Sequence, residues 1–102
     1  MRTKDKYILK GKKFVPEYDL IKWATWFETA DRHVADDIFG KVRVSTIFLG
    51  LDHNFESGKP ILFETMIFGG KHDQNQERYH TWEEAEKGHK KAVKLVKEAT
   101  ND

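Results

Sequence analysis

The chain has 102 residues, no cysteine, and a near balance of 18 lysine and arginine residues against 17 aspartate and glutamate residues. This length predicts one domain, residues 1–102, with a single hydrophobic core. The lack of cysteine excludes disulfides and thiolate metal sites. The balanced charge disfavours a protein that works by binding nucleic-acid phosphates, since such proteins usually carry a clear basic excess.

No apolar run approaches the about 20 residues that a membrane helix needs. The charged start of the chain, Met1–Lys6, lacks the apolar segment of a signal peptide. We therefore expect a cytoplasmic protein with no membrane partner, and the lack of cysteine fits that reducing compartment.

The first predicted elements are a strand at Lys6–Lys10 and a helix that begins between Pro16 and Asp19 and continues to Glu28. Proline is tolerated in a first turn, and acidic side chains there complement the helix dipole. Apolar residues at helical spacing predict a core-facing side. They are Leu20, Trp23, Ala24 and Phe27. Trp26 lies off the centre of that side, where an exposed tryptophan would be a binding anchor.

Three strands are predicted in the middle of the chain: Arg32–Phe39, Arg43–Leu51 and Ile61–Phe68. Gly40–Lys41 suits a two-residue hairpin turn between the first two strands. The polar link Asp52–Pro60 joins the second strand to the third. The polar run Lys71–Glu77 is predicted to be a loop.

A second helix is the last predicted element. Thr81 and Glu84 have the spacing of a capping box, in which each side chain satisfies a backbone N–H at the helix start. An apolar stripe follows at a period of about 3.6 residues. Its members are Trp82, Ala85, His89, Ala92, Val93 and Val96. Gly88 lies beside His89, where a glycine would let the helix approach the sheet closely.

The order β-α-β-β-β-α predicts an α+β domain with an antiparallel sheet of three to four strands and two helices packed on it. The strand Arg43–Leu51 has apolar residues on both faces, with Ile47 on one set of positions and Phe48 on the other. A sheet with one solvated face should alternate more cleanly. The second face is therefore either covered or an interface with a partner protein or a second copy, which would give a homodimer through the sheet.

The pairs Asp52–His53 and His72–Asp73 invite a metal site, but the predicted hairpin separates them. They follow neighbouring antiparallel strands at opposite ends, roughly 25 Å apart, whereas zinc needs its nitrogen donors at about 2 Å. We therefore predict no metal site and assign these residues to loop polarity and turn capping.

Glu64 lies in an otherwise apolar strand, and a buried Glu64 near His89 would be the best acid/base pair in the chain. The structural alternative is an ion pair of Glu64 with Arg43, together with a hydrogen bond from His89 to a strand carbonyl. No nucleophile elbow, Walker-type loop or dinucleotide loop is present. We therefore predict no catalytic residue and no cofactor.

The last helix also carries a ridge of lysines: Lys87, Lys90, Lys91, Lys94 and Lys97. An α-β-β-β-α core with a basic second helix resembles the topology of double-stranded RNA-binding domains. Those domains place lysines at the helix start, where this chain has Glu83–Glu84. The alternative for these lysines is a solvated face whose charges match the helix dipole.

Several long segments resemble a family of small phage and prophage proteins, and the resemblance covers most of the chain from Val15 to Val96. The segments are Val44–His53, Leu62–Gly70 and Tyr79–His89, together with Trp23 and Trp26–Thr29. No activity is established for that family, so no catalytic residue carries over. The resemblance implies a phage accessory protein that acts in a bacterial cytoplasm.

The sequence therefore favours a non-enzymatic protein that binds a host or phage macromolecule or a small ligand, with inhibition of a host defence system as one form of that function. The alternatives are a nucleic-acid-binding domain and a small enzyme that uses Glu64 and His89. The residues predicted to bind are Trp26, Glu64, His89, Lys90, Lys91 and Lys94.

Overall fold

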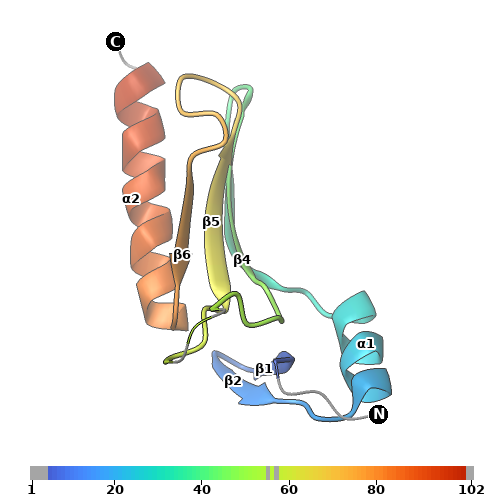
Figure 1. Ribbon diagram of the computed structural model, residues 1–102. Helices are drawn as coiled ribbons and strands as arrows, with labels where there is room; N and C mark the ends of the chain where they lie inside the picture. Colours follow the sequence, from blue (N-terminus) through green and yellow to red (C-terminus); the bar gives the residue numbers. More distant parts are fainter. Residues whose placement is uncertain (1–4, 55, 57, 101–102) are drawn as a thin grey trace.

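The computed structural model describes residues 5–54, 56 and 58–100, and within them it has two helices and six strands (Figure 1). Residues 1–4, on which the expectation about a signal peptide partly rests, lie outside the described residues, as do 55 and 57. The elements are β1 Tyr7–Lys10, β2 Lys13–Pro16, α1 Leu20–Thr29, β3 His33–Phe39, β4 Val42–Phe48, β5 Phe63–Phe68, β6 Gln76–Tyr79 and α2 Trp82–Thr100. Neither of these helices is long and apolar enough to cross a bilayer.

Four antiparallel strands form the main sheet in the order β3-β4-β5-β6, which confirms the predicted α+β class. Phe39 lies opposite Val42, so Gly40 and Lys41 form the predicted two-residue turn, with Gly40 at a φ of 62°. The edge strand β6 was not predicted, because Gln76–Tyr79 overlaps the expected loop. Its first three residues are polar and exposed on both faces of the sheet, so they carry no alternating pattern.

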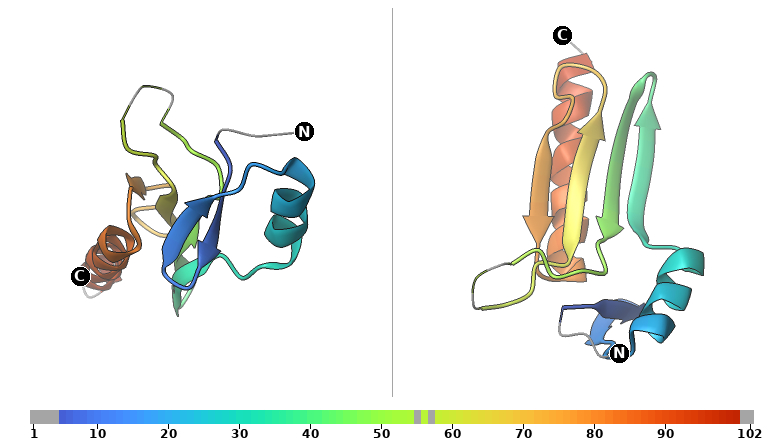
Figure 2. Two further views of the ribbon diagram at one scale, coloured as in Figure 1. Left: turned by 90° about the horizontal axis from the view of Figure 1, so that it is seen from below. Right: turned by 45° about the vertical axis from the view of Figure 1, so that its right-hand side comes forward.

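The helix α2 lies along one face of the main sheet, behind the sheet in the right-hand view of Figure 2. Alternate residues of β4 and β5 point toward the helix and are buried, including Val44, Phe48 and Ile67. Ala85 and Val96 of the helix are buried against opposite ends of this face. Burying each large apolar side chain stabilises the fold by about 1.5–3 kcal/mol, so this interface is the main hydrophobic core.

The start of α2 has the capping box that the sequence predicts. The Glu84 backbone N–H donates to Thr81 Oγ1 at 3.1 Å. In return, Glu84 Oε1 accepts from the backbone N–H groups of His80 and Thr81, each at 3.0 Å. The box fixes the residue at which the helix begins, and with it the positions of the helix side chains over the sheet.

Gly88 lets α2 approach β6, as the sequence predicts. A Cβ atom at residue 88 would lie 2.0 Å from Tyr79 Oη and 2.2 Å from Tyr79 Cζ. Both distances are well inside van der Waals contact, so any side chain there would displace the Tyr79 ring.

The hairpin β1-β2 forms a separate two-stranded sheet around the turn at Gly11–Lys12. The predicted first strand therefore lies outside the main sheet. An isolated antiparallel bridge between Lys6 and Leu51 connects the chain just before β1 to the chain just after β4. Leu9 and Phe14 pack on the buried cluster at that end of the core. The strand β2 was missed because Pro16, expected in the first turn of a helix, is the last residue of this strand.

The helix α1 begins after Asp19, whose carboxylate accepts from the backbone N–H groups of Ile21 at 3.0 Å and Lys22 at 3.1 Å. It lies beyond the end of the main sheet, on the side away from α2 (Figure 1). The predicted helix thus exists, but it starts later than the expected range and does not share the face that α2 covers.

Trp23, Trp26 and Phe27 make the inner side of α1, whereas Ala24 is exposed, contrary to the predicted core face. The Trp23 indole N–H is shared between the backbone oxygens of Tyr7 and Gly50, each at 3.1 Å. This bond joins α1 to both the hairpin and the end of β4.

Gly88→Ala should lower the stability of the fold. Alanine gains about 1 kcal/mol of helix propensity, but displacing Tyr79 should cost about 1–3 kcal/mol as overpacking. In a Tyr79→Ala background the same change should instead stabilise. Urea unfolding of the four variants measures this sign reversal, and a Gly88→Ala change that stabilises both backgrounds would contradict the close approach.

Candidate functional site

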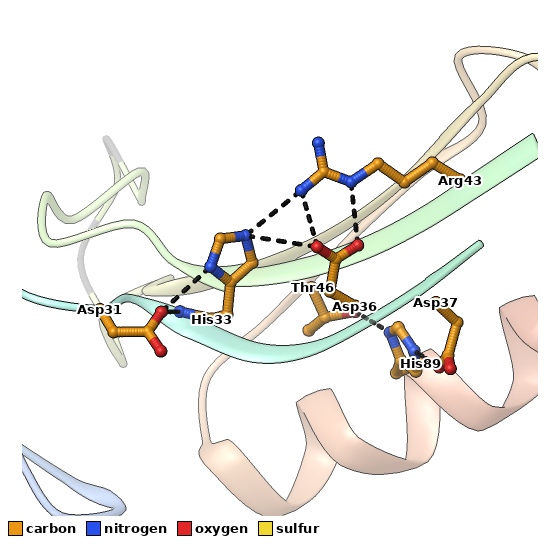
Figure 3. A network of polar contacts seen from close by, with 7 residues as sticks. All are labelled: Asp31, His33, Asp36, Asp37, Arg43, Thr46 and His89. Atoms are coloured by element: carbon orange, nitrogen blue, oxygen red, sulfur yellow. Dashed lines mark hydrogen bonds and ion pairs between the residues drawn. The ribbon is translucent and has the colours of Figure 1, made fainter.

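A chain of polar groups crosses the interface between α2 and the main sheet, with a half-exposed carboxylate, that of Asp37, at one end and buried groups along the rest (Figure 3). His89 is 4% exposed, and its Nε2 lies 2.7 Å from Asp37 Oδ2 on β3. Its Nδ1 lies 2.7 Å from Thr46 Oγ1 on β4, and Thr46 is hydrogen-bonded in turn to Thr65 on β5. One helix and three strands are therefore joined through their side chains, inside the core for β4 and β5 and at its edge for β3.

The direction of these bonds follows from the acceptors. The ionised Asp37 carboxylate can only accept, so His89 Nε2 carries the proton. In a neutral imidazole Nδ1 is then an acceptor, so Thr46 donates to it and Thr65 donates to Thr46. The prediction that His89 bonds a strand carbonyl is wrong, because its partners are the Thr46 hydroxyl and the Asp37 carboxylate.

This arrangement has the connectivity of a carboxylate–histidine–hydroxyl triad but not the access that such a triad needs. Thr46 has 0% exposure, so no substrate atom can reach its hydroxyl. The chain instead satisfies polar groups that would cost about 1–3 kcal/mol each if buried without partners. We assign it to holding α2 in register with the sheet.

Glu64 and His89 are not brought together. Glu64 points to the face opposite α2, where its Oε2 accepts from Arg78 Nε at 3.0 Å and from Gln76 Nε2 at 2.7 Å. Its expected partner, Arg43, instead lies opposite Phe68 in the β4–β5 register. The sheet separates the predicted acid/base pair, so the two residues share no site.

Arg43 belongs to a second polar cluster at the β3 side of the sheet (Figure 3). It donates to both carboxylate oxygens of Asp36, at 2.9 Å from Nε and 2.8 Å from Nη2. This bond holds the pKa of Asp36 below its ordinary value and raises the pKa of Arg43. His33 Nε2 lies 3.9 Å from Asp36 Oδ2, and its Nδ1 lies 3.0 Å from Asp31 Oδ1.

The face of the main sheet that carries these pairs is not covered by any segment among the described residues, and we call it the uncovered face. In the right-hand view of Figure 2 it faces the viewer. Ile38 is 70% exposed and Phe68 is 40% exposed, while Ile47 and Met66 are half-buried between the strands. The face is made by His33, Asp36, Ile38, Arg43, Ser45, Ile47, Glu64, Met66, Phe68, Gln76 and Arg78.

The remaining predicted binding residues lie elsewhere. Trp26 is half-buried, and its ring meets Phe48 edge-on at a centroid distance of 5.8 Å. Lys90, Lys91 and Lys94 are exposed on α2. Lys91 and Lys94 reach carboxylates at 3.9 Å, those of Glu77 and Glu98 respectively.

Asp52 and Asp73 have the turn-capping role that the sequence suggests. Asp52 Oδ1 accepts from the backbone N–H groups of Asn54 at 2.8 Å and Ile61 at 2.9 Å, and Asp73 Oδ1 accepts from that of Gly69 at 2.6 Å. The first site follows β4 and the second follows β5, so they lie at opposite ends of the sheet. In the part of the chain that the structure describes, no three histidine, aspartate or glutamate side chains are grouped to hold a metal ion.

A pocket of about 320 Å³ lies between α2 and the β5–β6 side of the main sheet. Its lining comes from β5, from the segment 75–77 at the start of β6 and from the second half of α2. Sequence reasoning missed this pocket, because one of its walls belongs to an unrecognised strand.

No family model matches the chain, and no curated protein or solved structure is significantly similar to it. The uncovered face and the pocket are therefore the features of the chain that bear on its function.

Thr46→Val should destabilise the fold by about 1–3 kcal/mol, because it leaves His89 Nδ1 buried without a donor. Urea unfolding measures the loss. Thr29→Val is the matched control, since Thr29 is exposed on α1 and surface changes usually stay within about 0.5 kcal/mol. Equal effects of the two substitutions would contradict a structural role for the buried chain.

The Asp36–Arg43 pair should make stability fall in acid. The pKa of Asp36 lies below its ordinary 3.8 in the folded chain, so its contribution is complete above that value and is lost as the pH falls through the folded pKa. Asp36→Asn should therefore lower the urea midpoint near neutral pH and show a smaller further fall toward about pH 3. Glu56→Gln, in an exposed loop, is the control, and an unchanged pH profile in Asp36→Asn would contradict the assignment.

Proposed function

We propose that this chain is a non-enzymatic binding protein that contacts a partner protein through the uncovered face. The observation that carries the proposal is the exposure of Ile38 and Phe68, at 70% and 40%, at one end of that face. They lie on β3 and β5, on either side of Arg43 of β4. Large apolar side chains grouped on one surface favour protein contact. Ile47 and Met66 continue the apolar strip toward the other end.

The size of the face favours a partner larger than the face itself. With strands about 4.8 Å apart and about 3.3 Å per residue, the sheet offers roughly 400 Å². A stable specific complex buries at least about 1,200 Å² of accessible surface in total. A partner protein that extends past the edges of the sheet reaches that size more readily than a second copy stacked on this face, so we favour it over a homodimer through the sheet.

The charges on the face favour a protein partner over a nucleic acid. Both arginines are already paired, Arg43 with Asp36 and Arg78 with Glu64. A phosphate would have to displace a carboxylate to reach either guanidinium. Polar pairs that flank an apolar strip are typical of the rim and core of a protein interface.

The resemblance to small phage and prophage proteins supplies the context of the proposal. The partner would be a host or phage protein in a bacterial cytoplasm. Inhibition of a host defence system is the form of this function that small size and the lack of a recognisable catalytic motif support.

Affinity capture from phage-infected host lysate, followed by mass spectrometry, tests the proposal. The protein retained by the native chain should be lost with Ile38→Lys combined with Phe68→Lys, because both charges would be buried against the partner. Ile21→Lys is the control, since Ile21 is 76% exposed on α1 and lies outside the face. Equal capture by all three baits would contradict the proposal.

The same experiment separates the nucleic-acid alternative. Retained nucleic acid that is released by moderate salt, and is lost when Lys90, Lys91 and Lys94 are replaced by glutamate, would assign binding to α2 instead.

A further inference from the structure

We propose that the pocket between α2 and the β5–β6 side of the sheet is a binding site for a small zwitterionic molecule with an apolar body, such as an aromatic amino acid. The pocket has a volume of about 320 Å³, which is at the lower end of the range for small-molecule sites. It opens on the α2 side of the sheet, and of the residues that line it Gln76, on the edge strand β6, also belongs to the uncovered face.

The floor of the pocket is apolar. Ile67 of β5 and Ala92 and Leu95 of α2 line it, and all three belong to or pack on the buried cluster at this end of the core. Thr65, which is 3% exposed, completes the inner wall, with its hydroxyl bonded to Thr46. Such a surface suits an aromatic or branched apolar group with a polar atom at one edge.

The rim of the pocket carries equal numbers of opposite charges. Lys91 and Glu77 face each other across it with 3.9 Å between Nζ and Oε1. Lys94 and Glu98 are separated by the same 3.9 Å along the helix. Both lysine side chains are 78% exposed, so each ammonium group can turn toward a ligand at little cost.

This charge pattern selects the class of ligand. A purely anionic ligand would be repelled by Glu77 and Glu98, and a purely cationic one by Lys91 and Lys94. A ligand with one carboxylate and one ammonium group can pair with both signs while its body covers the apolar floor. Binding of a zwitterion therefore satisfies the rim without leaving a charge unpaired.

A series of three indoles tests the proposal, with the backbone amide signals of Ile67, Ala92 and Leu95 followed by NMR. L-Tryptophan is the zwitterion, indole-3-propionate the anion and tryptamine the cation, and all three share one ring. L-Tryptophan should shift these signals saturably and bind about tenfold more tightly than the other two. No shift with any of the three, or equal affinity for all three, would overturn the proposal.

Two variants of α2 sharpen the test. Lys94→Glu combined with Glu98→Lys exchanges the charges but keeps an ion pair in the favourable helical order, so it should fold and weaken L-tryptophan binding about tenfold. Ala92→Leu should fill the floor and abolish binding. Lys90→Glu, an exposed site on the same helix outside the pocket lining, is the control and should bind as the native chain does. Binding that is unaffected by both the charge exchange and Ala92→Leu would place the ligand elsewhere and overturn the proposal.

Discussion

The packing of α2 on one face of the main sheet is the constraint on which the rest of the structure depends. Its apolar part joins Val44, Phe48 and Ile67 to the helix, and its polar part is the buried chain through His89. Apolar contacts alone would let a helix slide or rotate on a sheet at modest cost. Hydrogen bonds to Asp37 and Thr46 are directional, so they fix one rotation and one register of the helix.

This single-sided packing explains both candidate surfaces. With α2 on one face and α1 beyond the end of the sheet, the opposite face keeps Ile38 and Phe68 exposed. On the helix side, the pocket lies where α2 passes β5 and the start of β6. The two surfaces open on opposite sides of one sheet and meet at Gln76 of its edge strand.

The parts of the fold that were predictable are those encoded by local pattern. The capping box at Thr81 and the two-residue turn at Gly40 are short-range motifs with a definite geometry, and both are present. The strand β6 was not predictable, because an edge strand exposed on both faces needs no alternation. The partners of Glu64 lie on β6, so they depend on the register of β5 with a strand that no local pattern specifies. The partner of Arg43 is Asp36 of β3, which follows from the register that the predicted turn at Gly40 sets, and the ion pair of Arg43 with Glu64 was expected instead. The sequence likewise placed Glu64 and His89 on adjacent elements but could not tell on which side of the sheet each would lie.

A row of hydroxyl groups hydrogen-bonded in sequence can be oriented in only two senses, and one proton decides between them. The row from Asp37 through His89 and Thr46 ends at Thr65, which also lines the pocket. The hydroxyl orientation at the pocket wall is therefore tied, bond by bond, to a carboxylate at the far end of the row.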